Sequence, residues 1–535
     1  MRFSVTVLSI FALCLWAGVS LLWFLSYENS FLRLLSTRLF GANGQMGAPV
    51  LLNLDSLSKK VQQEITDSFD KYGYNSYVSD LIGFHRSLPN PCPSSCKENE
   101  KSLPKTSVIV TFHDESLSVL MRTINSLLNN TSQELLEEII LVDDASAEVR
   151  IEKHLDDYLV KTKNIKIIRS KERNGLSRSR MIGLKYASAE VVTFADSNCE
   201  FPAGWLEPLL KEIKTNENVI VSPVLDIIDP YTFEYKITKH VFVGGFNWNL
   251  KFKWLAIPPR RDETAPVTTP VLPGGVFSIS RSFLLKIGGF DEGLSYIGGE
   301  IFDISFRGWM CGATIKIVPC SHVGYLFPTK ISQKLLPKEE DLLKNLQRIA
   351  KAWMDDYVGL FYERTGARHI KPPDVSKETE IRRKLSCNSF EWYLENVYRD
   401  FHVPKDTVFA GRLRNFDFAV CLGSQIDAYK HFHPVNIDEN CERIEENYWL
   451  FTNDGKIRQD DFCLERNDDE VHLKLCDDGK FQLWTYNETT REIRLQGDND
   501  ICLGVFLNTE TNTRNIGIQN CNNRYFGKAW TFEMF

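Results

Sequence analysis

The chain has 535 residues, too many for one ordinary hydrophobic core, so we expect two or more domains. Its formal net charge is −7 and no strongly basic segment stands out, so we expect no nucleic-acid partner. Aromatic residues make up 12% of the chain, a content that suits packed domains and sugar stacking equally well.

The N-terminus carries a nearly unbroken apolar run over residues 3–25, long enough to span a bilayer at roughly 20 residues. Arg2 precedes it and places residues 1–2 in the cytoplasm. A cleaved signal peptide is the competing interpretation, but the run exceeds the usual apolar core of about 7–15 residues and no clear cleavage site follows. We therefore predict one N-terminal transmembrane helix, with the rest of the chain in a lumen.

Residues 26–90 mix Asn, Ser, Gly and charged residues, and we interpret them as a stem with one helix near Asp55–Tyr72. A lumenal location agrees with the cysteines, because an even set with repeating spacings predicts disulfides in an oxidising compartment. A zinc cluster is the alternative, but this set has no C-x-x-C pairs. The six residues are Cys421, Cys441, Cys463, Cys476, Cys502 and Cys521.

From residue 107 onward, apolar strand patterns alternate with amphipathic helix patterns, which predicts a parallel sheet with crossover helices. The predicted strands are 107–112, 139–142, 165–168 and 191–195, and the predicted helices are 114–129 and 175–187. Three strands end in polar residues, which are Thr111, Asp144 and Asp196. This layout is typical of a nucleotide site at a sheet edge, and without a glycine-rich phosphate loop we expect a metal to hold the phosphates.

The stretch VVTFADSNCE, Val191–Glu200, carries the most specific signal at that edge. A buried strand runs into Asp196-Ser197-Asn198, and side chains two apart could face one metal or one phosphate. An Asx-rich turn leaving the strand is the alternative interpretation of the same residues.

The following segment contains several Gly-Gly pairs, which mark either ordinary turns or close approach of a backbone to a ligand. We predict a strand pair within Cys311–Phe327 and a charged helix over Glu339–Tyr357. Residues 366–407 are largely polar at their start and contain Pro372-Pro373, so we interpret them as an interdomain linker.

The last part of the chain contains an internal repeat. Cys421-Leu422-Gly423, Cys463-Leu464-Glu465 and Cys502-Leu503-Gly504 recur about every 40 residues, each followed by a Cys and a Trp. Three short β repeats that cannot bury their own cores must close on one another, which predicts a β-trefoil. We expect one disulfide in each repeat, namely Cys421–Cys441, Cys463–Cys476 and Cys502–Cys521.

With these residues in view, the chain from residue 85 onward resembles the polypeptide N-acetylgalactosaminyltransferase family, which begins mucin-type O-glycosylation. The motifs that carry the resemblance are TSVIVTFH, EIILVDDAS, Arg173-Asn174-Gly175-Leu176, GGFNW and SCNSFEWYLENVY. The resemblance implies a GT-A-like, Rossmann-like α/β glycosyltransferase domain over residues 91–365 and a ricin-type β-trefoil lectin domain over 408–535. It also implies a single-pass type II protein of the Golgi membrane.

The activity implied by the resemblance is transfer of GalNAc from UDP-GalNAc to Ser or Thr of polypeptide or glycopeptide acceptors, with retention and with Mn²⁺. A diphosphate leaving group needs a cation, which a metal supplies. The implied donor-binding residues are Thr111, Asp144, Arg173 and Gly274, with Glu300 as the catalytic carboxylate near the sugar. The implied acceptor residues are Phe252, Trp254 and Phe327.

The family also implies two disulfides in the catalytic domain. These are Cys311–Cys387 and Cys96–Cys320, with Cys92 as the alternative partner of Cys320. We expect Cys199 to be a free thiol because it follows the site strand into the interior.

This sequence departs from the family at the metal ligands, which would be Asp196, Asn198 and Tyr325. Asn198 and Tyr325 replace histidines, so oxygen ligands remain but the nitrogen donors that suit Mn²⁺ are lost. The family's Trp-Gly-Gly-Glu-Asn is here Ile297-Gly298-Gly299-Glu300-Ile301, and Pro328 replaces an arginine. Metal binding is therefore expected to be impaired.

The lectin repeats depart as well, because the family binds GalNAc through the Asp of Cys-Leu-Asp. Here only Glu465 keeps a carboxylate, while Gly423 and Gly504 have none, so we expect weak or no GalNAc binding. Two hypotheses remain open from the sequence. One is a polypeptide GalNAc-transferase of weakened activity, and the other is a catalytically inactive paralogue that acts as a lumenal binding or regulatory protein.

Overall fold

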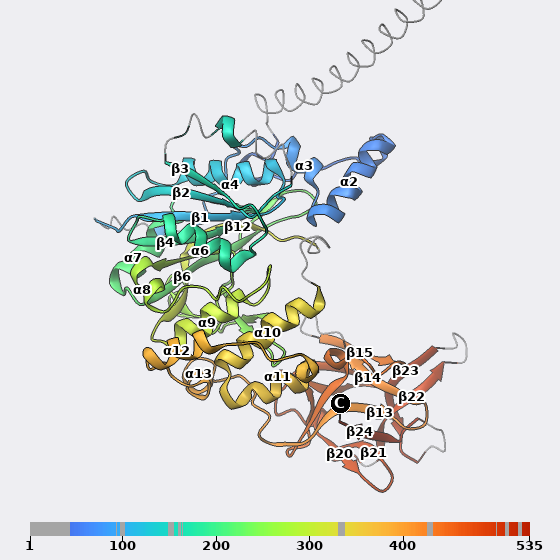
Figure 1. Cartoon of the computed structure of the whole chain (residues 1–535). Coiled ribbons are helices and arrows are strands. Elements are labelled where there is room, and N and C mark those ends of the chain that lie inside the picture. The colour runs from blue at the N-terminus through green and yellow to red at the C-terminus, as the bar shows by residue number, and fades with distance from the viewer. Residues whose placement is uncertain are drawn as a thin grey trace, which may run out of the picture.

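The computed structural model describes residues 43–534 except 93, 97–101, 148–154, 159–161, 163, 330–337, 425–431, 499, 509–512 and 523–526. Figure 1 shows an α/β domain with helices on both sides of a central sheet and, C-terminal to it, a separate domain built mainly of β-strands. Both predicted fold classes are therefore confirmed.

The central sheet follows the order β10-β12-β6-β11-β4-β1-β2-β3, and short β5 and β7 pair with β12 and β6 off this path. The four strands β1–β4 run parallel, as predicted. Their bounds are β1 Thr106–Phe112, β2 Leu136–Asp143, β3 Ile165–Arg169 and β4 Val191–Asp196. The others are β5 Cys199–Glu200, β6 Val219–Ile228, β7 Tyr235–Lys236, β10 Val267–Thr268, β11 Val276–Ser280 and β12 Thr314–Leu326.

The sheet is mixed and not wholly parallel, which corrects the prediction. β11 is antiparallel to both of its neighbours, β4 and β6. The chain enters β11 at the edge where β4 ends, because the Gly275 carbonyl accepts a 2.9 Å hydrogen bond from the Asp196 amide. This inserted strand places the Gly274-Gly275 turn directly beside Asp196.

A second correction concerns the strand pair predicted within Cys311–Phe327. The structure has the single 13-residue strand β12, which pairs with β6 and shifts register between Val318 and His322. Its end pairs with β5, so that Tyr325 lies opposite Cys199. A pattern of apolar residues interrupted by Pro319-Cys320 resembles a hairpin in sequence, but here it marks an irregularity within one strand.

Helices cover both faces of the sheet, and β1 is therefore buried on both of its faces. Val108 and Val110 face a core built with α4 (Leu117–Asn130) and α7 (Glu207–Thr215). Ile109 faces the opposite core, to which several other helices of the domain contribute buried residues. Those helices are α6 Leu176–Tyr186, α8 Arg281–Lys286, α9 Glu300–Met310, α10 Glu339–Trp353, α11 Val358–Thr365 and α13 Phe390–Asn396.

The described part of the predicted stem is built into this domain. The predicted helix is present as α2 (Lys59–Tyr72), and α3 (Ser76–Leu81) follows it. Tyr74 and Val78 are buried against Phe233, and Arg86 forms a buried ion pair with Glu200. The stem prediction for residues 26–90 is therefore wrong from residue 43 onward, because these contacts are long-range and leave no local pattern.

The predicted membrane anchor, residues 3–25, lies outside the described residues. Within the part of the chain that the structure describes, none of the helices has the length and apolar character needed to cross a bilayer.

The predicted linker over residues 366–407 also proves to be part of the catalytic domain. It forms α12 (Ser376–Lys384) and α13 (Phe390–Asn396), and α10 ends earlier than predicted, before a short 3₁₀ turn at Asp355–Tyr357. Phe390, Tyr393 and Phe401 are buried around Phe246. The chain therefore crosses between the domains only after Phe401.

The C-terminal domain is the predicted trefoil, and its core repeats one interaction three times. The indole nitrogens of Trp449, Trp484 and Trp530 donate to the carbonyls of Leu422, Leu464 and Leu503 at 2.7, 2.8 and 2.9 Å. The same Cys-Leu-Trp pattern that defines the repeat in sequence therefore packs its centre. The strands are β13 Thr407–Asn415, β14 Val420–Ser424, β15 Phe432–Asp438, β16 Tyr448–Thr452, β17 Ile457–Gln459, β18 Phe462–Asn467, β19 Glu470–Leu475, β20 Trp484–Asn487, β21 Glu492–Leu495, β22 Ile501–Asn508, β23 Thr513–Asn520 and β24 Trp530–Glu533, with a short helix α14 at Ile444–Asn447.

All five predicted disulfides are present. They are Cys96–Cys320, Cys311–Cys387, Cys421–Cys441, Cys463–Cys476 and Cys502–Cys521. Cys96, and not Cys92, is the partner of Cys320, and Cys199 is a buried free thiol as expected.

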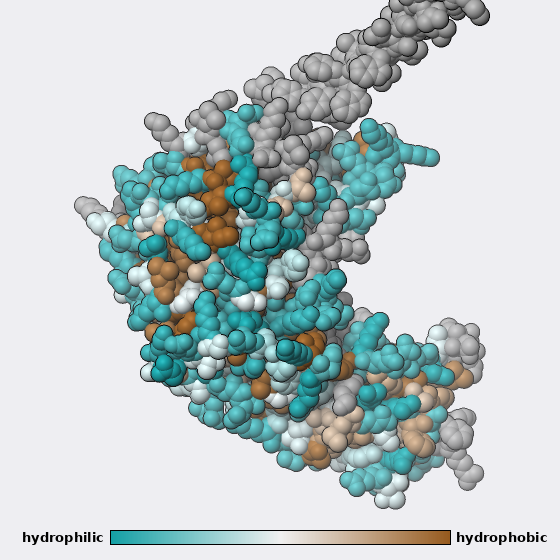
Figure 2. Space-filling view, in the orientation of Figure 1, coloured by the Kyte–Doolittle hydropathy of each residue, from teal (hydrophilic) through white to brown (hydrophobic). Residues whose placement is uncertain are grey.

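The two domains meet through a charged contact, which we call the domain clamp: Arg364, Asn247, Lys253, Asp460 and Asp461. Arg364 on α11 donates to both carboxylate oxygens of Asp460, at 3.1 and 3.2 Å, and Asn247 donates to the same carboxylate at 3.3 Å. Lys253, in the hairpin of β8 (Phe242–Phe246) and β9 (Phe252–Ala256), pairs with Asp461. Figure 2 shows the outline of the molecule hollowed above this junction.

The clamp generates a prediction about how firmly the trefoil is held. Asp460→Asn leaves the Arg364 guanidinium, whose side chain is 6% exposed, without its counter-ion. We expect a loss of about 2 kcal/mol of docking free energy. Calorimetry should then resolve two unfolding transitions, with faster proteolysis after Phe401. The matched control is Asp468→Asn, which removes the same charge from an exposed turn. Equal behaviour of the two variants would contradict the role of the clamp.

Candidate functional site

The sheet edge brings together the three polar residues that the sequence singled out. Thr111 on β1 lies in register with Asp196 on β4. Asp144 follows β2, and its amide donates to the Phe112 carbonyl at 2.9 Å. All three therefore end adjacent parallel strands, where open α/β sheets bind their ligands.

Asp144 organises the predicted donor segment. Its carboxylate accepts hydrogen bonds from the amides of Asn174 and Gly175, at 2.6 and 2.8 Å, and Arg173 lies 4.0 Å away. Gly175 has a φ of +86°, and a Cβ there would lie 2.5 Å from the Tyr296 carbonyl oxygen. Glycine is therefore required for the segment to pass between Asp144 and the loop that carries Tyr296.

Glu300 is the first residue of α9 and is buried, with 4% of its surface exposed. Its two carboxylate oxygens accept from the Gly298 amide at 3.0 and 2.8 Å. Burial raises the pKa of Glu300, while the bonds from Gly298 and its own amide oppose that rise. The predicted Gly274 lies close to this helix, since a Cβ there would meet the Ile301 side chain at 3.1 Å.

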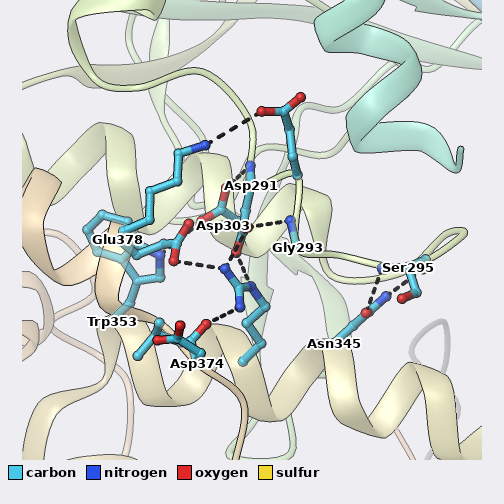
Figure 3. A network of polar contacts seen from close by, with 12 residues as sticks. Asp291, Gly293, Ser295, Asp303, Asn345, Trp353, Asp374 and Glu378 are labelled. Carbon is cyan, nitrogen blue, oxygen red and sulfur yellow. Dashed lines mark hydrogen bonds and ion pairs between the residues drawn. The ribbon is translucent and has the colours of Figure 1, made fainter.

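The loop before Glu300 is fixed by side chains that the sequence did not single out. Asn345 on α10 accepts from the Ser295 amide at 2.9 Å and donates to the Ser295 carbonyl at 2.8 Å (Figure 3). It also donates to the Gly298 carbonyl at 3.0 Å. Arg348, one turn further along α10, donates to the Asp291 carboxylate at 2.6 and 3.0 Å. This network holds both ends of the loop and thereby places Glu300.

Sequence reasoning missed Asn345 and Arg348 because α10 has an ordinary amphipathic pattern with charged residues. The usable signal was a polar residue on the apolar side of that helix, since Asn345 is buried with 3% exposure. Such a residue usually has specific hydrogen-bond partners. Its partners, however, are 50 and 47 residues away in sequence.

The three predicted metal-ligand positions do come together, but their side chains bond one another and the neighbouring backbone. The Tyr325 hydroxyl donates to one oxygen of the Asp196 carboxylate at 3.2 Å. Arg180 from α6 donates to the other oxygen at 3.3 Å. The Asn198 amide nitrogen donates to the Leu326 carbonyl at 2.8 Å.

The charge state of this cluster keeps the Tyr325 hydroxyl protonated, so that it donates a hydrogen bond to Asp196. Burial and the neighbouring charge of Asp196 raise the pKa of Tyr325 well above its ordinary value, so its phenol stays protonated. Burial also raises the pKa of Asp196, while the positive charge of the Arg180 guanidinium lowers it and so offsets part of the rise. A neutral phenol that donates to the only carboxylate of the three is a poor ligand for a divalent cation.

The residues present therefore do not fit a Mn²⁺ ion. Among the described residues, no three His, Cys, Asp or Glu side chains gather closely enough to hold a metal. His322 is near in sequence, but its Nδ1 lies 3.0 Å from the buried Asp226 carboxylate, which the Tyr235 hydroxyl also contacts at 2.8 Å. Impaired metal binding stays a prediction, which the hydrogen bonds of Tyr325 and Asn198 support.

The predicted acceptor residues form two aromatic pairs. Phe252 and Trp254 on β9 meet edge to face, with ring centroids 5.1 Å apart. Phe327 lies against Tyr325 at 4.7 Å, next to the Asp196 cluster. All three predicted acceptor residues are partly exposed.

In the trefoil, Glu465 on β18 is held by its own repeat. Gln482 donates to it at 2.8 Å, Lys474 lies 3.3 Å away, and His472 lies 3.7 Å away. In the other two repeats a glycine stands at the position of Glu465, and a neighbouring side chain fills the space that a carboxylate would need. A Cβ at Gly423 would lie 2.7 Å from the Asn436 side chain, and one at Gly504 would lie 2.0 Å from that of Gln519.

We therefore predict that any GalNAc binding by the trefoil occurs in the middle repeat. If the trefoil binds GalNAc, Glu465→Ala should remove that binding, because the sugar hydroxyls lose an acceptor worth about 1–3 kcal/mol. Calorimetric titration with a GalNAc-peptide measures this. The matched control is Glu470→Ala, an exposed carboxylate in the same hairpin. Unchanged binding by the Glu465 variant would place the sugar site elsewhere.

The metal-ligand positions give a prediction in the opposite direction. Asn198→His with Tyr325→His should raise Mn²⁺ affinity, because it removes a competing donor to Asp196 and adds two imidazoles, each worth roughly 10–100-fold. Electron paramagnetic resonance of free Mn²⁺ measures the affinity directly. Tyr325→Phe is the control, since it removes the hydroxyl without adding a nitrogen. An equal gain in both variants would contradict ligation by the new histidines.

Comparison with known proteins agrees with this geometry. Residues 107–288 match the model of the glycosyl transferase family 2, and residues 409–530 match that of the ricin-type β-trefoil lectin domain. The solved structure of GalNAc-T7 with UDP, GalNAc and Mn²⁺ superposes with a TM-score of 0.72, at 28% identity over 92% of this chain and 93% of that one. The fold and site thus define a GT-A-like glycosyltransferase joined to a lectin domain.

Relatives of similar length give the family. Polypeptide N-acetylgalactosaminyltransferase 13 of Homo sapiens is 39% identical over 79% of this chain and 77% of its own length. Polypeptide N-acetylgalactosaminyltransferase 5 of Caenorhabditis elegans is 38% identical over 79% of this chain and 69% of its own. The chain belongs to the polypeptide N-acetylgalactosaminyltransferase family.

Proposed function

We propose that this protein transfers GalNAc from UDP-GalNAc to Ser or Thr hydroxyls of polypeptide or glycopeptide acceptors, with retention and with weakened activity. The observation that carries the proposal is the shared sheet edge. Thr111, Asp144 and Asp196 end adjacent strands there, and the Gly274-Gly275 turn beside Asp196 also lies against Ile301, the residue that follows the buried Glu300. Family membership supplies the donor and the acceptor class.

The residues of this chain divide the reaction between them. Asp144 and the segment it holds form the nucleoside end of the site, with Arg173 beside them. Glu300, fixed through Gly298, offers a carboxyl group whose raised pKa suits a hydrogen bond to a sugar or acceptor hydroxyl. Phe252, Trp254 and Phe327 offer rings on which a peptide or sugar can stack.

The weakening follows from the charge that the leaving diphosphate develops. The solved structure of GalNAc-T7 holds Mn²⁺ together with UDP, but the residues of this chain at the predicted metal positions do not fit that ion. Electrostatic stabilisation is often the largest contribution to such a reaction, and the loss of one oriented donor can cost about 10²–10³ in rate. A slow transferase is the expected outcome.

A second function, favoured by one observation, is that of an inactive paralogue that binds glycopeptide or nucleotide in a lumen. The observation is that Tyr325 and Arg180 occupy both oxygens of Asp196. An arrangement that satisfies the carboxylate internally stabilises the fold without needing substrate or metal.

For location, we propose the Golgi membrane, with residues 3–25 as the anchor and both domains in the lumen. Five disulfides support an oxidising compartment.

A transfer assay separates the two functions. We expect the purified full-length protein to incorporate labelled GalNAc from UDP-GalNAc into mixed mucin peptides slowly. Glu300→Gln should lower this rate by about 10²-fold or more, because it removes the buried carboxyl group. The control is Glu292→Gln, a partly exposed carboxylate in the neighbouring loop. Incorporation no greater than that of Glu300→Gln would favour the inactive paralogue.

A further inference from the structure

We propose that the donor site binds its nucleoside diphosphate without a divalent metal, and that Arg180 supplies the cation. The inference rests on the proposed function for the class of ligand, a uridine diphosphate sugar. It concerns how this chain neutralises the diphosphate, and it therefore applies to a slow transferase and to a nucleotide-binding paralogue alike.

Arg180 is placed as a preformed cation at the site. It lies on α6 with 3% of its side chain exposed, among the rings of Phe194, Phe277 and Phe290 at 5.4–5.9 Å. These rings hold the planar guanidinium in one orientation. Its side chain needs no reorganisation before it meets a ligand.

One nitrogen of that guanidinium is unsatisfied. Nη2 donates to Asp196 at 3.3 Å, but Nη1 is buried and has no hydrogen-bond partner among the described residues. Buried donors nearly always have a partner, so an orphaned N–H at the edge of a ligand site indicates a missing acceptor. A phosphate oxygen is the acceptor that a guanidinium binds best.

The neighbouring side chains favour an anion over a second cation. Tyr325 donates to the remaining oxygen of Asp196, and the Asn198 amide nitrogen is turned to the Leu326 carbonyl. A divalent ion at Asp196 would lie beside the Arg180 guanidinium and would have to displace the phenol. Conversely, the two donors on Asp196 reduce the repulsion that this carboxylate would exert on a diphosphate.

The position along the sheet edge also suits a diphosphate. Asp196 is 25% exposed on its side chain, so the cluster opens to solvent there. Thr111, the predicted uridine contact, is in register with Asp196 on the adjacent strand. A nucleotide whose base lies toward Thr111 and Asp144 therefore presents its phosphates toward Asp196 and Arg180.

The test is a calorimetric titration of UDP, and of uridine, into the purified full-length protein with EDTA and then with MnCl₂. We expect the UDP dissociation constants in the two conditions to agree within about twofold, and uridine to bind more weakly than UDP. UDP binding that requires Mn²⁺ would overturn the inference and leave the proposed donor intact. No UDP binding in either condition would overturn the proposed donor as well.

Arg180→Met should weaken UDP binding by roughly tenfold or more in EDTA, while uridine binding stays unchanged. The matched control is Lys185→Met, which removes one charge from an exposed position of the same helix. Because Arg180→Met leaves Asp196 without its counter-ion, Arg180→Met with Asp196→Asn is measured too, with circular dichroism melts to establish folding. UDP affinity unchanged in both folded variants would overturn the role of Arg180.

A converse variant completes the test. Asn198→His with Tyr325→His removes the phenol from Asp196 and should make UDP binding tighter in MnCl₂ than in EDTA, an effect that we do not expect of the wild type. A wild-type protein that already shows this metal effect would contradict the inference.

Discussion

The contact of Asp196 with Arg180 and Tyr325 is the constraint on which the site depends. It joins the end of β4, helix α6 and the end of β12 at one carboxylate. Because a guanidinium and a phenol donate to its two oxygens, the Asp196 carboxylate is satisfied by protein groups alone. The same edge in a metal-dependent enzyme would need open ligands. The chemistry of this chain therefore follows from two side chains, Arg180 and Tyr325, that donate hydrogen bonds to Asp196. A metal site would instead need side chains that offer lone pairs to the ion.

Around that contact, the fold is built to hold the site rigidly from three directions. Helix α10 fixes the loop before Glu300 through Asn345 and Arg348. The inserted strand β11 sets its preceding turn against Asp196. The domain clamp ties hairpin β8–β9 to the trefoil through Lys253 and Asp461. Rigid scaffolds of this kind position binding groups at little entropic cost when a ligand arrives.

The trefoil separates packing from recognition. Its three indole-to-carbonyl bonds and three disulfides use residues that every repeat keeps. The position that would bind sugar keeps a carboxylate only at Glu465. A repeat can lose its ligand contact at little structural cost, because that side chain lies outside the Cys-Leu-Trp core. The trefoil therefore folds, and stays in contact with the catalytic domain, independently of whether it binds sugar.

The sequence alone determined the strands of the parallel half-sheet, the three trefoil repeats and the disulfide within each repeat, because those depend on local periodicity and on the repeat itself. The two disulfides of the catalytic domain followed from the resemblance to the family, which left the partner of Cys320 open between Cys96 and Cys92. Tertiary structure alone decided that residues from 43 onward and helices α12 and α13 belong to the catalytic domain, and that β11 runs antiparallel. It also decided that Arg180 and Tyr325 meet at Asp196, across 16 and 129 residues of sequence. Contacts between such distant residues leave no periodic trace in one sequence, so only the folded chain reveals which side chains share a charge.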